Sequence, residues 1–196
     1  MTKTRLEAFS DGVLAIVITN MVLELKPPVH PEFSALLPLV PVLLSYVLSF
    51  IYVGIYWSNH HHLCHVITHV NGKVLWANLH LLFWLSLFPF VTAWIGEAHP
   101  EPAPAVVYGV VLLMAAIAWY ILQITIIGAQ GPSSILRSAL GRDWKGKLSP
   151  VIYLAAIPLA FVNPWISIAL YSLVALLWIV PDRRIERLPG EHSSAP

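Results

Sequence analysis

Side chains that could do chemistry gather in two places in this chain. The first lies between residues 60 and 69, which hold five histidines and the chain's one cysteine, Cys64. Imidazole and thiolate are good ligands for zinc and other transition metals, and imidazole can also carry protons near neutral pH. The second is the first long apolar segment, which contains the polar residues Ser10, Asp11, Thr19, Asn20 and Glu24.

The histidines are spaced for one helical face but not for one metal ion. His61, His65 and His69 recur every fourth residue and would share a face. They would span about 12 Å along a helix, so only a pair such as His61 and His65 could meet at one ion. We therefore predict no dedicated metal site and expect cations at a helix C-terminus, where the helix dipole favours them. A regulatory metal or a proton sensor is the alternative.

The composition places the elements that hold these residues in a membrane. Of 196 residues, 58% are hydrophobic and 11% charged, whereas a soluble domain is about half apolar and a quarter charged. A net charge of +1 gives no reason to expect nucleic acid as a partner. One cysteine excludes an intrachain disulfide. The first apolar segment carries Asp11 and no small-residue cleavage site follows it, so we interpret it as a mature helix.

Six segments could cross a bilayer, which takes about 20 mostly apolar residues each. We predict one all-α transmembrane domain over residues 1–196, with spans near 8–25, 36–66, 74–95, 105–127, 150–162 and 165–180. If the spans alternate in direction, ten of the eleven basic residues fall on one side and only Lys26 on the other. Because basic residues concentrate on the cytoplasmic side, both termini are predicted to be cytoplasmic.

The first span has two faces that need a partner. Ile16, Thr19, Asn20 and Leu23 fall within an arc of about 100° on a helical wheel, and Asp11 lies about 140° away. Polar groups within a span usually face protein or water. We expect Asp11 to orient the helix through a buried network, with Arg5 as its first candidate partner and His60 and His80 as others.

The stripe from Ile16 to Leu23 has two interpretations. It could be a packed helix interface, in which Thr19 and Asn20 hydrogen-bond to other helices. It could also line a pore, in which Ile16 and Leu23 form apolar rings that make an ion shed water, a step that costs potassium less than sodium. The chain has no T-V-G-Y-G filter, since Tyr52-Val53-Gly54 sits inside a span.

Other function classes have weaker motifs. His60 and His80, on the second and third spans, could hold a b-type haem in an electron-transfer protein, which is the alternative function. No Gly-rich phosphate loop and no H-E-x-x-H occurs, so no enzyme activity is predicted. A coupled transporter usually has inverted repeats or helices that break at the midplane of the membrane, and the sequence shows neither pattern.

A family resemblance emerges at the start of the first span. Residues Arg5 to Asp11 read R-x-x-x-F-S-D, Trp57 and His60 form a W-x-x-H, and Asn78 and Pro89 follow in the third span. This pattern resembles the endolysosomal potassium channel family, transmembrane protein 175, in its single-repeat prokaryotic form. The resemblance covers the first three spans, about half the chain.

The resemblance implies a potassium-permeable channel of the cell membrane, built as a homotetramer whose first helices line one central pore. It implies no cofactor beyond the permeant potassium ion, and it leaves proton permeation open. Its pore positions carry over to Ile16, Thr19 and Leu23, which match the stripe on the wheel. Asn20 departs from the family, which more often has an apolar residue there. The implied structural network consists of Arg5, Phe9, Ser10, Asp11, Trp57, His60 and Asn78.

Overall fold

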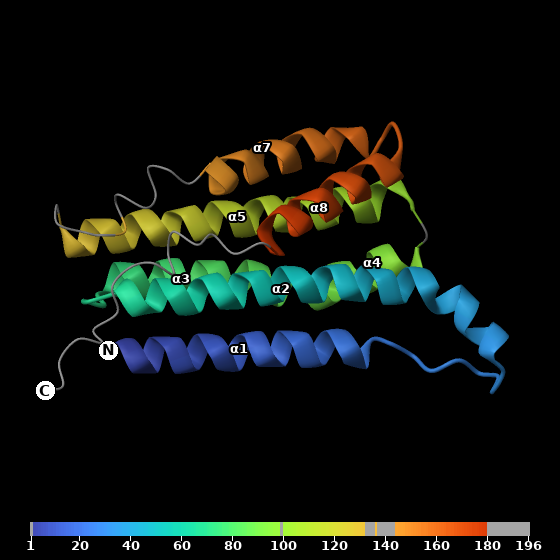
Figure 1. Ribbon diagram of the computed structural model, residues 1–196, viewed down its shortest axis with the longest axis horizontal. Coiled ribbons are helices and arrows are strands. Elements are labelled where there is room, and N and C mark those ends of the chain that lie inside the picture. The colour runs from blue at the N-terminus through green and yellow to red at the C-terminus, as the bar shows by residue number, and fades with distance from the viewer. Residues whose placement is uncertain (1, 99, 132–135, 137–143, 180–196) are drawn as a thin grey trace, which may run out of the picture.

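In the computed structural model every regular element of the described residues, 2–98, 100–131, 136 and 144–179, is a helix. The elements are α1 (Lys3–Leu23), η1 (Phe33–Leu39), α2 (Val40–Val66), α3 (Gly72–Ser86), α4 (Phe88–Glu97), α5 (Pro102–Gln130), α7 (Trp144–Leu159) and α8 (Pro164–Ile179). Consecutive spans run in opposite directions (Figure 1). The helix α1 packs on α2, α3 and α4, whereas α7 packs on α5 and α8.

Four of these segments are long and apolar enough to cross a membrane: Lys3–Leu23, Phe33–Val66, Gly72–Glu97 and Pro102–Gln130. The helices α7 and α8 have 16 residues each, or about 24 Å at 1.5 Å per residue. They form an antiparallel pair (Figure 1), in which α7 packs on α5 whereas α8 packs on both α5 and α2. The predicted all-helical architecture with six spans fits this arrangement, with two of the six shorter than a typical bilayer core.

The third predicted span is not continuous. It breaks at Leu87 into α3 and α4, because Pro89 has no N–H to donate to the carbonyl of Leu85 and its ring clashes with that turn. The backbone resumes its helical bonding when Val91 N–H donates to Leu87 O at 3.1 Å. The second span likewise starts as the 3-10 helix η1, which contains Pro38, before α2 continues it.

The bundle is held together by small residues as well as large ones. On α5, a Cβ added to Gly109 would collide with the hydroxyl of Tyr171 and come within 2.9 Å of Ile157 Cγ1. The Tyr171 hydroxyl in turn donates to Ala105 O at 3.1 Å. A glycine at position 109 therefore lets α8 lie directly against α5.

Candidate functional site

One face of α1 is committed to the interior of the subunit. The buried residues recur at intervals of three and four positions: Leu6, Ser10, Leu14, Val17 and Met21. This spacing keeps them on one stripe of the helix, which is the stripe that packs on α2, α3 and α4.

The face of α1 that includes Ile16 and Leu23 is not covered by any other helix of the described chain. Ile16 is 61% exposed and Leu23 72% exposed, and Thr19 and Asn20 between them are exposed too. The Thr19 hydroxyl donates to Ala15 O at 2.8 Å, which leaves its oxygen lone pairs free to accept. An amide and a hydroxyl facing hydrocarbon are costly, so this stripe needs water or protein against it.

A buried hydrogen-bond chain fixes the other side of α1. Asn78 Nδ2 donates to Ser10 Oγ at 2.9 Å, and Asn78 Oδ1 lies 2.8 Å from His60 Nε2. His60 Nδ1 lies 3.6 Å from Cys64 Sγ, and Ser10 Oγ donates to Leu6 O. Ser10, His60 and Asn78 are all at most 3% exposed. One amide therefore ties α1 to α2 through α3.

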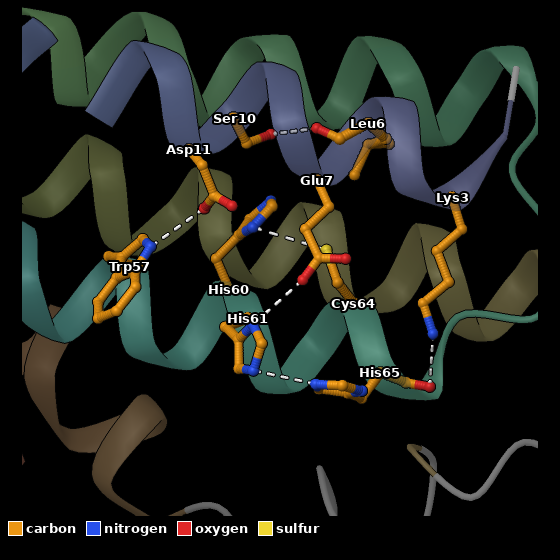
Figure 2. A network of polar contacts seen from close by, with 10 residues as sticks. All are labelled: Lys3, Leu6, Glu7, Ser10, Asp11, Trp57, His60, His61, Cys64 and His65. Carbon is orange, nitrogen blue, oxygen red and sulfur yellow. Dashed lines mark hydrogen bonds and ion pairs between the residues drawn. The ribbon is translucent and has the colours of Figure 1, made fainter. Parts of the chain in front are cut away.

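The predicted motif residues lie in different surroundings. Asp11 Oδ1 accepts a hydrogen bond from Trp57 Nε1 at 3.1 Å (Figure 2). Arg5 is exposed, and within the described residues its side chain makes no ion pair with Asp11. The partner of Asp11 in this subunit is therefore an indole rather than the expected guanidinium. Phe9, 51% exposed, lies outside the subunit's packed core.

The exposed histidines form a second contact between α1 and α2. His61 Nδ1 lies 3.1 Å from Glu7 Oε1, and His61 Nε2 lies 2.9 Å from His65 Nε2 (Figure 2). The expectation that His69 shares their face is wrong, because α2 ends at Val66 and His69 follows in non-helical backbone. In the part of the chain that the structure describes, no three His, Cys, Asp or Glu side chains converge as metal ligands.

The haem alternative has no support in these contacts. Both ring nitrogens of His60 already have protein partners, Asn78 and Cys64. The proposed second ligand, His80, accepts a hydrogen bond at Nε2 from Trp84 at 3.0 Å. Neither imidazole has its Nε2 free for an iron atom.

An open groove lies beside the C-terminal end of α1. It has a volume of about 890 Å³, and Asn20, Leu23, Pro89, Phe90 and Trp94 are among its lining residues. Two carboxylates, Glu24 and Glu97, also line it. Glu97 pairs with Lys26 at 3.5 Å. The Leu23 end of the stripe therefore adjoins a groove that combines apolar side chains with two carboxylates. The sequence did not predict this groove.

Sequence reasoning also missed a second polar cluster in the core. Thr92 Oγ1 donates to Ser49 Oγ at 2.6 Å, and Ser49 Oγ lies 2.9 Å from Tyr108 OH. This cluster joins α2, α4 and α5. The available signal was the presence of hydroxyl residues inside apolar spans, where they commonly bond between helices.

A bundle of apolar helices that fixes one helix by a buried polar network, and leaves that helix's mixed-polarity face open, has the architecture of a helical membrane channel subunit. Comparisons with known proteins agree. The family model described as endosomal/lysosomal potassium channel TMEM175 matches residues 5–89. The chain is 54% identical over 192 residues to a potassium channel of Chryseobacterium sp. (strain P1-3), covering 98% of this chain and 100% of that protein.

Two further matches come from Chamaesiphon minutus. A potassium channel of strain ATCC 27169 / PCC 6605 is 31% identical over 186 residues, covering 88% of this chain and 91% of its own. The crystal structure of a lysosomal potassium-selective channel TMEM175 homolog from that species superposes with a TM-score of 0.79 at 29% identity, covering 90% of this chain and 96% of that one. The chain belongs to the TMEM175 family, which confirms the family predicted from the R-x-x-x-F-S-D pattern.

Proposed function

We propose that this protein is a potassium-permeable cation channel of the cell membrane that works as a homotetramer. The observation that carries the proposal is the open stripe of α1, in which Thr19 and Asn20 lie exposed between Ile16 and Leu23. Polar groups on such a face need water or protein, and copies of α1 around an axis would supply both. The potassium-channel names of the Chryseobacterium and Chamaesiphon relatives support this assignment.

The selectivity mechanism follows from the order of groups along the stripe. A ring of Ile16 side chains is the narrowest point and resists wetting, so a cation must shed water to pass. Potassium holds its hydration shell less tightly than sodium and so passes at a lower cost. The Thr19 hydroxyls, whose hydrogens are engaged by Ala15 O, turn oxygen toward the ion on its way. Leu23, about two turns further on, forms a second and wider ring.

Both termini are cytoplasmic in this proposal. Support comes from contacts that bring helix ends together: Lys3 Nζ donates to His65 O at 3.0 Å, and Gln130 Nε2 donates to Val66 O at 2.6 Å. The start of α1, the end of α2 and the end of α5 therefore share one end of the bundle. The excess of basic residues that the sequence assigns to this side makes it the cytoplasmic end.

The experiment is current through purified protein in bilayers, with potassium on one side and sodium on the other. We expect a reversal potential displaced toward potassium. Ile16→Cys should become sensitive to a small cationic thiol reagent, which would block the current. Leu173→Cys is the matched control, because Leu173 is 48% exposed but lies on α8. The native Cys64 is buried, so the unmodified protein should not respond to the reagent.

Two results would contradict the proposal. One is folded protein that carries no potassium current. The other is block of Leu173→Cys together with resistance of Ile16→Cys, which would place the conduction path along a different helix.

A further inference from the structure

The contact between His61 and His65 is unusual for two surface residues. Their Nε2 atoms lie 2.9 Å apart, and their rings are nearly perpendicular, at 87° to each other. Two solvated imidazolium groups would repel at this distance. A hydrogen bond at this distance needs one Nε2–H as the donor and the lone pair of the other Nε2 as the acceptor.

Glu7 decides which nitrogen holds the proton. Its Oε1 lies 3.1 Å from His61 Nδ1, and a carboxylate can only accept, so Nδ1 of His61 is the protonated nitrogen. A neutral His61 then presents a lone pair at Nε2, toward His65. A carboxylate that holds the far nitrogen of an imidazole is the arrangement that orients histidine ligands in metal sites. The Glu7 contact reaches across from α1, so it is not a product of helical spacing on α2.

We propose that His61 and His65 form a binding site for a divalent transition-metal ion such as Zn²⁺, with Glu7 orienting His61 from α1. Two Zn–N bonds of about 2.0–2.1 Å at a tetrahedral angle place the nitrogens about 3.3 Å apart. The rings need to separate by only a few tenths of an ångström to admit the ion. The proton on Nε2 of His65 moves through solvent to Nδ1 of the same ring. Two neutral imidazoles then bind the ion without net proton release.

The charges around the pair are compatible with a cation. The ammonium of Lys3 donates to the backbone carbonyl of His65 at 3.0 Å, so it is directed to the backbone and not to the imidazole ring. Cys64 is fully buried, and its Sγ lies 3.6 Å from His60 Nδ1, so the thiol faces the interior of the bundle and not the exposed pair. The His61 side chain is 47% exposed, which gives an ion access from solvent. Water fills the remaining coordination positions, since among the described residues no third ligand converges with this pair.

The test is zinc binding to the purified, chelator-treated protein in detergent, measured by calorimetry. We expect one site per subunit in the wild type. His61→Ala or His65→Ala should weaken binding at least tenfold, and Glu7→Gln should weaken it about tenfold, the usual effect of losing an orienting carboxylate. His30→Ala is the control and should bind as the wild type does, because His30 is an exposed histidine in the loop that follows α1.

Equal zinc binding in the wild type, His61→Ala and His65→Ala would overturn the proposal, because the ion would then be held elsewhere, the pore included. Absence of any binding in the wild type would also overturn it. All three positions are on the surface or half-buried, and elution as a single oligomeric species shows that each variant is folded. Any effect of zinc on current rests on the proposed channel function. A protein that binds zinc as expected yet carries no current would refute that function and leave the site intact.

Discussion

Asn78 is the residue on which the position of α1 depends most directly. Its single side-chain amide serves Ser10 on α1 and His60 on α2, and both contacts are buried. No replacement of similar volume without an amide can make both. Within the described chain every buried side-chain nitrogen and oxygen has a partner, so this network has no spare bonds.

We expect Asn78→Leu to destabilise the subunit by about 2–3 kcal/mol, because it leaves His60 Nε2 and Ser10 Oγ with unsatisfied hydrogen-bonding capacity in the interior. Thermal unfolding of the purified protein measures this. Ser58→Ala, an exposed position on α2, is the control and should unfold with the wild type. Equal melting temperatures for Asn78→Leu and the control would show that the network contributes nothing to stability.

Asp11 gives a second prediction at the residue scale. Two substitutions distinguish the role of its negative charge from its role as a hydrogen-bond acceptor. Asp11→Ala removes the partner of Trp57 Nε1. Because this hydrogen bond is exposed, its loss costs about 0.5–1.5 kcal/mol. We expect loss of assembled protein more than altered ion preference. Asp11→Asn keeps an oxygen acceptor and should recover most of the assembly, as judged by size-exclusion chromatography. A fully assembled Asp11→Ala channel with normal conductance would contradict this role.

Single residues also show where sequence reasoning stopped. The R-x-x-x-F-S-D pattern located Ser10 and Asp11 correctly on α1, but it could not choose partners, because those depend on how three helices face one another. Trp57, not Arg5, donates the hydrogen bond to Asp11. Residue spacing does not predict how α1 is rotated about its axis, so it could not predict that Arg5 is exposed.

At the scale of elements, close packing of α5 against α8 depends on the absence of a side chain at Gly109. Ala there would press on the Tyr171 ring, which is fixed by its bond to Ala105 O. We expect Gly109→Ala to destabilise the protein by about 1–3 kcal/mol, the usual cost of overpacking. Gly128→Ala on the same helix meets nothing within 4 Å, and it should be neutral or slightly stabilising because Ala is the better helix former.

Thermal unfolding compares the two glycine variants directly. If both shift the melting temperature equally, the effect comes from helix propensity and not from the contact with Tyr171.

The membrane-spanning helices themselves were largely predictable from the sequence, since a lipid-spanning helix needs a long apolar run. Their internal breaks were less so: Pro89 signals a break in the third span, but only the structure places it at Leu87.

At the scale of the whole molecule, the stripe of α1 from Ile16 to Leu23 is the exposed surface on which the proposed function rests. The stripe of α1 was found from the helical wheel alone, and the structure leaves Ile16 and Leu23 well exposed. In the proposed homotetramer, contacts between copies cover that stripe, and the sequence pattern of one chain does not specify those contacts. The groove with Glu24 and Glu97 was missed for a related reason, because its residues come from separate helices.

The central claim is that Ile16 forms the ring that discriminates between potassium and sodium, and one measurement tests it most directly. Reversal potentials are recorded for wild type and Ile16→Asn with potassium and sodium on opposite sides of a bilayer. An amide at that ring would wet the constriction and lower the cost of sodium entry, so we expect higher conductance and a reversal potential that moves toward zero. An unchanged reversal potential in a folded, conducting Ile16→Asn channel would contradict the account and remove Ile16 from the selectivity mechanism.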